Sequence, residues 1–178
     1  MLNKVNINKI GFLFKYEHLN KDGEVIWSQD WSPNQFADEG FYQMFDIYFR
    51  GCTTAPDAFK VGLVHTALYQ TSTIVQITGV EVAGTGYARQ TLLRATSAGG
   101  FQTLALSTGD MQITADTVQF ESTSADTAWT TASHAYLIAH MTGATSQFVC
   151  WQALSTGRIL QAGDKLNVTI KAKGTQPA

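Results

Sequence analysis

Charged residues are scarce in this sequence, and their scarcity restricts the partners that the protein can bind. Only 15% of the 178 residues are charged, and the formal net charge is −2. Soluble domains average about 25% charged residues. Binding to a phosphate backbone requires clustered lysines and arginines that release counterions. We therefore expect no nucleic-acid partner.

Long apolar runs and targeting signals are also missing. No stretch approaches the roughly 18 apolar residues that a bilayer-spanning helix needs. Residues 1–10 alternate polar with apolar side chains and do not form the continuous apolar segment of a signal peptide. We expect no membrane partner, and a protein that is made and kept in a cytoplasm until release.

Cysteine is rare, which argues against a disulfide framework. The sequence holds two cysteines, Cys52 and Cys150, and they form no CxxC pair. Such spacing indicates neither a zinc knuckle nor a set of disulfides. Cys150 lies in the apolar stretch Phe148–Trp151, so we interpret it as a buried free thiol.

Catalytic and metal-binding motifs are absent from the sequence. It contains no Gly-x-Ser-x-Gly, no His-Glu-x-x-His and no Gly-x-x-x-x-Gly-Lys-Ser/Thr. His134 and His140 flank one predicted strand and would face the same side, but a metal site needs at least a third ligand. We predict no catalytic residue, no metal and no cofactor, and hence no enzyme.

Four carboxylates leave one enzymatic alternative open. They lie within a short stretch of sequence at Asp110, Asp116, Glu121 and Asp126. A glycoside hydrolase needs two carboxyl groups about 5 to 9.5 Å apart across a cleft. The simpler interpretation is that these are polar groups of loops and strand edges.

Threonine, serine and glycine, by contrast, are abundant between residues 71 and 156, and they alternate with short β-branched runs. β-branched residues favour strands, and glycine-containing pairs favour turns. Repeated short strands without a helical period between them predict an antiparallel β-sandwich or jelly-roll and exclude a parallel α/β fold. The predicted strands beyond residue 57 are 59–64, 74–77, 87–93, 111–114, 117–120, 135–139, 148–154 and 166–171.

A β-hairpin is predicted near the start of the chain. Phe12, Phe14 and Tyr16 alternate with polar or outward positions, and Asn20–Gly23 then interrupts the pattern. Alternation resumes at Val25, Trp27, Gln29 and Trp31. Period-two apolar placement on both sides of an Asp-Gly pair is the strongest short-range signal of a hairpin.

One substantial helix is predicted near residues 38–50. Its apolar side chains recur at spacings of three and four residues, at Phe41, Met44, Phe45, Tyr48 and Phe49. Asp38 is the expected N-cap, and Gly51 the expected left-handed C′ residue. We expect this stripe to cover a sheet, with Phe45 and Phe49 in the core; the alternative is a face that docks onto a partner.

The remaining segments complete a predicted single domain over residues 1–178. The hairpin and helix of residues 1–51 would pack on a β-sandwich of residues 57–173, followed by a short tail at 174–178. Residues 66–73 and 99–109 are the least periodic stretches, so we expect exposed loops there.

Several stretches, read in order, resemble a family of small virion structural proteins of tailed bacteriophages, whose members are head decoration, collar, fibre or tail components. The resemblance covers most of the chain. It rests on Phe14–Glu17 with Ile26–Trp27, Phe49–Gly51, Gly84–Gln90, Thr127–Thr130, Ala135–Ala139 and Gln161–Val168, the last containing Ala162-Gly163-Asp164.

The resemblance implies a non-enzymatic structural component of a virion that is assembled in the host bacterial cytoplasm. The expected position is that of a capsid decoration or collar protein, with major capsid, collar or tail proteins as partners. A homo-oligomer is also expected, since trimers are common among decoration proteins of this type. The alternative is a tail-fibre or receptor-binding module for host surface carbohydrate, with Tyr16, Trp27, Trp31 and Trp129 as stacking residues.

Overall fold

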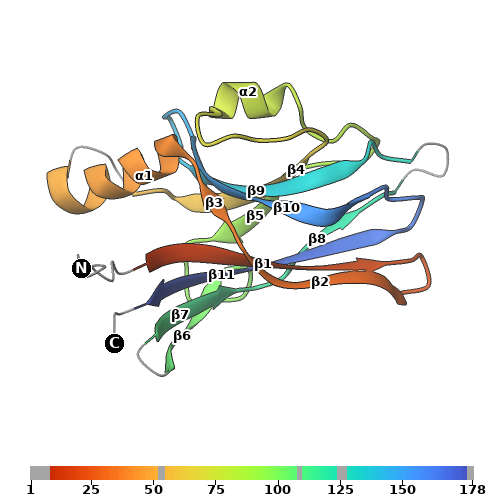
Figure 1. Ribbon diagram of the computed structural model, residues 1–178, viewed down its shortest axis with the longest axis horizontal. Helices are drawn as coiled ribbons and strands as arrows, with labels where there is room; N and C mark the ends of the chain where they lie inside the picture. The colour runs from red at the N-terminus through yellow and green to blue at the C-terminus, as the bar shows by residue number, and fades with distance from the viewer. Residues whose placement is uncertain (1–8, 52–54, 108–109, 124–127, 176–178) are drawn as a thin grey trace, which may run out of the picture.

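A computed structural model of the protein describes residues 9–51, 55–107, 110–123 and 128–175. Two β-sheets lie one above the other, with a short helix covering the upper sheet and a longer helix projecting at one end (Figure 1). Every pair of named strands in the described residues is antiparallel. This confirms the predicted mainly β, sandwich-like fold.

The first sheet contains six strands and includes the predicted hairpin. Its order is β2-β1-β11-β7-β6, and β8 pairs with another part of β11. β1 pairs with β11 along its whole length, so the hairpin is part of this sheet. The strands are β1 (Lys9–Leu19), β2 (Val25–Pro33), β6 (Phe101–Ser107), β7 (Asp110–Ala115), β8 (Val118–Glu121) and β11 (Lys165–Thr175).

The second sheet contains five strands in the order β3-β10-β9-β4-β5. Its central strand, β9, is buried along most of its length, because its side chains alternate between two apolar clusters. The strands are β3 (Gln35–Phe36), β4 (Ala58–Val64), β5 (Gln90–Leu93), β9 (Ala132–His140) and β10 (Gln147–Arg158).

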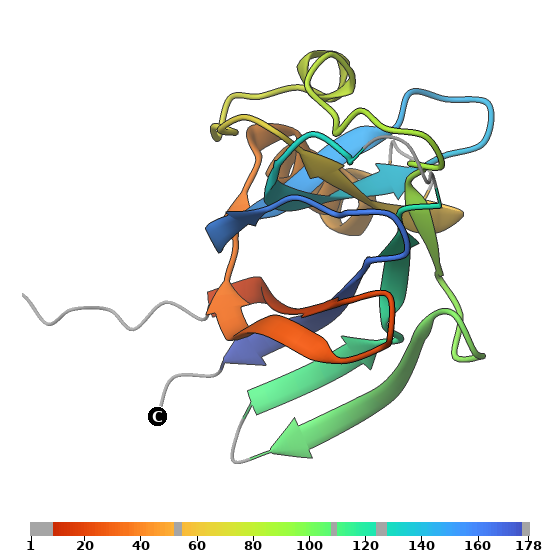
Figure 2. The same cartoon turned by 90° about the vertical axis from the view of Figure 1, so that its right-hand side faces the viewer.

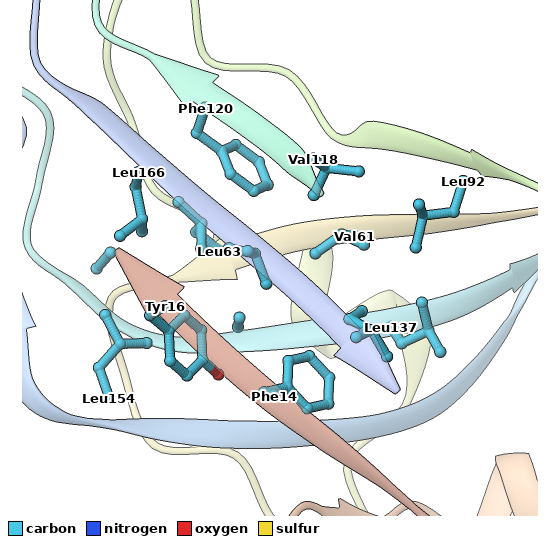
Figure 3. Close-up of a cluster of buried hydrophobic side chains, with 14 of the residues drawn as sticks. Phe14, Tyr16, Val61, Leu63, Leu92, Val118, Phe120, Leu137, Leu154 and Leu166 are labelled. Atoms are coloured by element: carbon cyan, nitrogen blue, oxygen red, sulfur yellow. The ribbon is translucent and has the colours of Figure 1, made fainter. Parts of the chain in front are cut away.

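The main core fills the space between the sheets. Phe14 and Tyr16 of β1 and Phe120 of β8 point from the first sheet toward Leu63 and Leu137 of the second (Figure 3). All five are fully or almost fully buried. The alternation of the hairpin is therefore confirmed as a period-two core pattern. Cys150 also belongs to this core, as a buried free thiol.

A second apolar cluster lies on the outer face of the second sheet. Tyr136 and Ile138 of β9 and Phe148 of β10 contribute to it, and α2 (Ile74–Thr78) covers it through Ile77. In Figure 2, α2 lies above this sheet, on the side away from the first sheet. The second sheet is thus apolar on both faces.

The predicted helix is present, and its last turn is wider than an α-helical turn. It consists of α1 (Asp38–Phe45) and a π-helical turn, η1 (Asp46–Arg50), in which the Gly51 N–H donates to the Asp46 carbonyl at 2.8 Å. Gly51 has φ of 63° and so occupies the predicted left-handed position. The N-cap is Ala37 and not Asp38, which is the first helical residue.

Three segments differ from the sequence-based assignment. The predicted strand at 74–77 is helix α2, because Thr73 and Gln76 form a capping box that outweighs the β-branched residues. The loop predicted at 99–109 is wrong for its central part, which forms strand β6. This strand lies at the edge of the first sheet and pairs with β7. The strand predicted at 87–93 begins at Gln90. The loop expected at 66–73 is confirmed and mostly exposed.

Candidate functional site: the aromatic helix face

Helix α1 packs on β10 through a stripe of small and polar residues. Gly40 and Gln43 are buried, and they are followed at the same spacing by buried Asp46 of η1. A Cβ atom on Gly40 would lie 2.5 Å from the Val149 carbonyl oxygen, so the two backbones meet at a distance that only glycine permits. The Gln43 amide reaches the Met141 sulfur at 3.5 Å.

The half-buried carboxylate of Glu39 also fixes the position of the helix. The Glu39 Oε2 atom accepts hydrogen bonds from the Phe148 N–H at 2.9 Å and from the Ile74 N–H at 3.4 Å. Glu39 therefore ties α1 to both β10 and the start of α2. At the other end, Arg50 pairs with Asp46 at 3.2 Å. The orientation of the helix is thereby set by polar contacts and close backbone packing.

The aromatic side chains lie on the opposite side of the helix, in solvent. Tyr48 and Phe49 are each 78% exposed, Tyr42 is 64% exposed and Phe45 is 54% exposed. Phe41 is 39% exposed, and its ring packs at a tilt against Phe36 of β3. The expectation that Phe45 and Phe49 fill the core is therefore wrong. The backbone contact at Gly40 selects the polar stripe as the packing side, and the aromatic stripe faces outward.

We call these five side chains, Phe41, Tyr42, Phe45, Tyr48 and Phe49, the aromatic helix face. The Phe45 and Phe49 rings contact each other with centroids 5.4 Å apart, and the Tyr42 hydroxyl accepts a hydrogen bond from Arg50 at 3.0 Å. Exposed apolar patches of this kind mark interaction sites, and aromatic residues are enriched in the buried centres of interfaces. The arrangement suits binding to an apolar surface of another protein.

The stretch Gly84–Gln90 makes packing contacts that hold the fold together. A Cβ atom on Gly84 would overlap the indole ring of Trp129, whose N–H donates to the Thr85 carbonyl at 3.0 Å. The Tyr87 ring packs edge-on against Trp129, with centroids 5.4 Å apart. Gly84 and Trp129, far apart in sequence, therefore contact each other closely, and the contact requires a glycine at position 84.

Tyr87 and Arg89 of that stretch converge on Glu81. The Arg89 guanidinium donates to both carboxylate oxygens at 2.9 and 3.0 Å, and the hydroxyls of Tyr87 and Tyr136 contact the same carboxylate. Bidentate pairing of this kind satisfies a partly buried charge. Burial, reinforced by the Glu81 charge, raises the pKa of the Tyr87 hydroxyl. These tyrosines stay protonated, so the cluster is a structural anchor.

A second polar cluster crosses the gap between the two sheets. His18 of β1 is 1% exposed. Its Nε2 lies 3.2 Å from the Asp164 carboxylate, and its Nδ1 accepts from Arg158 of β10 at 3.0 Å. Burial lowers the pKa of His18, with the nearby Arg158 charge acting in the same direction. His18 therefore connects Asp164, in the resembling stretch Ala162–Asp164 that precedes β11, with Arg158 of the second sheet.

The aromatic residues predicted to stack on carbohydrate do not form a surface cluster. Tyr16 and Trp129 are buried, at 0% and 2% exposure. Trp27 and Trp31 are half-buried. The Arg158 guanidinium carbon lies 5.1 Å from the centre of the Trp27 ring, and the Lys171 Nζ lies 4.3 Å from the centre of the Trp31 ring. The fourth tryptophan, Trp151, is buried as well. Two of the four tryptophans are therefore buried, and the other two have a cation over the ring.

His134 and His140 lie near opposite ends of β9 and do not meet. Six residues along a strand span about 20 Å, much more than a shared metal ion allows. Each ring instead contacts a serine, Ser133 at 2.9 Å and Ser146 at 3.2 Å. Within the described ranges, no group of three His, Cys, Asp or Glu side chains is arranged to hold a metal ion.

The carboxylates considered for hydrolysis are engaged separately. Asp110 pairs with Lys173 at 2.6 Å, and Glu121 with Lys165 at 3.7 Å. Their strand partners Thr175 and Lys165 lie ten residues apart on β11, which places the two carboxylates about 30 Å apart. That separation excludes a two-carboxylate site built on this pair.

The other two carboxylates of this group are Asp116 and Asp126. Asp116 accepts a hydrogen bond from the Gly99 N–H at 2.5 Å. Asp126 lies outside the described residues, as does Cys52. Helices long and apolar enough to cross a membrane are likewise not found in the part of the chain that the structure describes.

Sequence reasoning identified the aromatic stripe but missed the residues that decide which way it faces. Gly40, Gln43 and Asp46 recur every three residues, and this second, polar stripe was the available signal. A glycine inside a helix is unfavourable unless a close contact requires it. Glu81, the centre of the Tyr87 and Arg89 cluster, had no sequence signal, because its partners are brought to it only by folding.

Comparison with known proteins agrees with this structural picture. No curated protein is significantly similar to the chain. Residues 41–175, about three quarters of the sequence, match the family described as Podophage GP4 fiber I protein gp80. The match contains the whole aromatic helix face, the Gly84–Gln90 stretch and the Asp164 region. The chain therefore belongs to the podophage GP4 fiber I protein gp80 family and is a structural component of a phage virion.

Proposed function

We propose that this protein is a fibre subunit that attaches to a neighbouring virion protein through the aromatic helix face. The observation that carries the proposal is the exposure of Tyr42, Phe45, Tyr48 and Phe49 on a helix whose other side is already anchored. A helix that packs through Gly40 gains nothing for its own fold by exposing aromatic rings. The rings gain free energy when a second surface covers them.

The chemistry of the face indicates the kind of surface that it binds. Its rings project from a single helix, and the neighbouring cation Arg50 is paired with Asp46. Helical faces of this type insert into apolar grooves, with side chains one turn apart as anchors. We infer that the partner offers an apolar groove, in which Tyr48 and Phe49 are the deepest anchors because they are the most exposed in the free protein.

The position on the particle is the finer part of the proposal. The family description names a fibre protein, which supports a fibre over the capsid decoration or collar position expected from the sequence. The same docking chemistry would serve at any of these positions. The carbohydrate-binding alternative has weaker support, because the tryptophans that it requires are buried or covered by cations.

The experiment that tests the proposal is binding to particles assembled without this protein. The double variant Tyr48→Ala/Phe49→Ala is compared with Tyr69→Ala/Val75→Ala, which removes two similarly exposed apolar side chains near α2. Central aromatic anchors contribute about 2 kcal/mol or more each, so we expect affinity to fall at least about 100-fold for the first pair only. Equal binding by both double variants would refute the docking face.

Electron microscopy of the reconstituted particle then tests the position. Density of the protein along a fibre supports the proposal. Density on the outer head or around the neck would instead assign it to decoration or to the collar, with the docking face retained. The two parts of the proposal are therefore decided by separate measurements.

A further inference from the structure

The core-facing side of the first sheet continues beyond the region that the second sheet covers. Ile10 shares the inward face with Phe12, Phe14 and Tyr16 of β1, because side chains two residues apart point the same way. Ile10 is nevertheless 59% exposed, whereas Phe14 is fully buried. The inward face is therefore open to solvent at the end of the sheet where β1 begins.

Strand register shows that this open apolar region crosses the sheet to its edge. Ile10 is opposite Gly174, Gly174 is opposite Met111, and Met111 is opposite Leu106. Directly paired residues lie on the same face of a sheet. Met111 is 44% exposed and Leu106 70%, and Leu104, in the next row, is 64% exposed. The row ends at β6.

The outer edge of β6 has no neighbouring strand among the described residues. β6 is the last strand in the order of the first sheet and pairs only with β7. Edge strands present unpaired N–H and C=O groups, and proteins normally protect them with charged residues or proline. The sequence Phe101–Ser107 contains neither. The opposite edge strand, β2, contains Asp30 and Pro33 and has an irregular register.

We propose that β6 pairs with β6 of a second copy of this chain, antiparallel, about a two-fold axis at Ala105. The sequence Thr103-Leu104-Ala105-Leu106-Ser107 reads nearly the same in both directions. In this register, Leu104 is opposite Leu106 of the second copy, and both pairs lie on the open apolar face. The β6–β7 register is regular from residue 103 to residue 107, so the edge presented to the second copy is uninterrupted.

The choice of a second copy follows from this self-complementarity. A two-fold interface brings the same surface together from both subunits, so a segment must match its own reverse. The segment 103–107 does so in residue type, and it carries no charge that would repel an identical strand. Figure 2 shows the β6–β7 hairpin at the lower side of the molecule, on the side opposite α2, where a second sheet can extend the first.

This inference does not depend on the attachment of the protein to a particle, since it concerns strand β6 and not helix α1, and it is tested with the purified chain alone. The measurement is the molar mass in solution by sedimentation equilibrium over a range of concentrations. Three variants are compared with the parent: Leu104→Lys/Leu106→Lys, Leu104→Glu/Leu106→Lys, and the control Val75→Lys on α2, where the side chain is 78% exposed. Circular dichroism checks that each is folded.

The parent and Val75→Lys should form dimers. Leu104→Lys/Leu106→Lys places like charges opposite each other twice. We expect the dissociation constant of the dimer to rise at least about 100-fold. Leu104→Glu/Leu106→Lys places opposite charges together in the proposed register only, so it should restore the dimer. A monomeric or trimeric parent, a dimer that survives the two lysines, or a failure of the Glu/Lys variant to restore it would overturn the proposed pairing.

Discussion

Replacing Phe49 with alanine tests whether the aromatic helix face contributes to the fold of the free protein. A buried phenylalanine costs about 3 to 5 kcal/mol when truncated to alanine. Phe49 is 78% exposed, so only about one fifth of that contribution is present, which is under about 1 kcal/mol. Alanine also favours the helix by about 0.5 kcal/mol. We therefore expect a change in unfolding free energy close to zero.

The matched control is Phe120→Ala, at a position with 0% exposure in the main core. This variant should lose the full 3 to 5 kcal/mol or so, which for a domain of this size lowers the melting temperature by roughly 6 to 20 °C. Urea unfolding and thermal melts of both variants give the comparison. If Phe49→Ala were destabilised as much as Phe120→Ala, the helix would use this ring for its own packing, and the argument for a docking face would fail.

Two further predictions concern the polar and glycine contacts. The pKa of His18 is lowered in the folded state, so the unfolded chain binds more protons below pH 6.5 or so, and stability that is complete above this pH should fall as the pH decreases. His18→Gln, which keeps a neutral donor and acceptor for Asp164 and Arg158, should reduce that fall in urea midpoints measured at pH 7.5 and pH 5; an unchanged pH dependence would contradict the assignment. Gly84→Ala should destabilise strongly, because its Cβ atom overlaps the ring of Trp129, and Gly84→Ala/Trp129→Ala should lose little more than Trp129→Ala alone in thermal melts.

Much of the fold could be predicted because its signals are local. Alternation at Phe12, Phe14 and Tyr16 with a turn at Asn20–Gly23 defines a hairpin without reference to the rest of the chain. The apolar stretches that became β9 and β10 are bounded by turn residues, so their strands were also recognisable. Short strands without intervening helices leave an antiparallel sandwich as the arrangement that buries their apolar faces.

Other elements depended on contacts that the local sequence does not contain. Ile74–Thr78 has the composition of a strand, but a capping box and the burial of Ile77 on the second sheet make it a helix. The stretch that contains β6 was expected to be a loop because residues 99–109 show little periodicity, and the strand is defined by its pairing with β7. Glu81 gained its role from Arg89 and two tyrosines that only the fold brings near.

The candidate site shows this division most clearly. The sequence by itself determined that a helix ends at Gly51 and carries an aromatic stripe, because helical periodicity and capping are local properties. Only the tertiary structure decided that the stripe faces solvent. Periodicity shows which side chains share a face, but burial depends on what that face meets. Here the contact of Gly40 with Val149 allows the polar stripe to approach β10, and the aromatic rings are turned away from the protein.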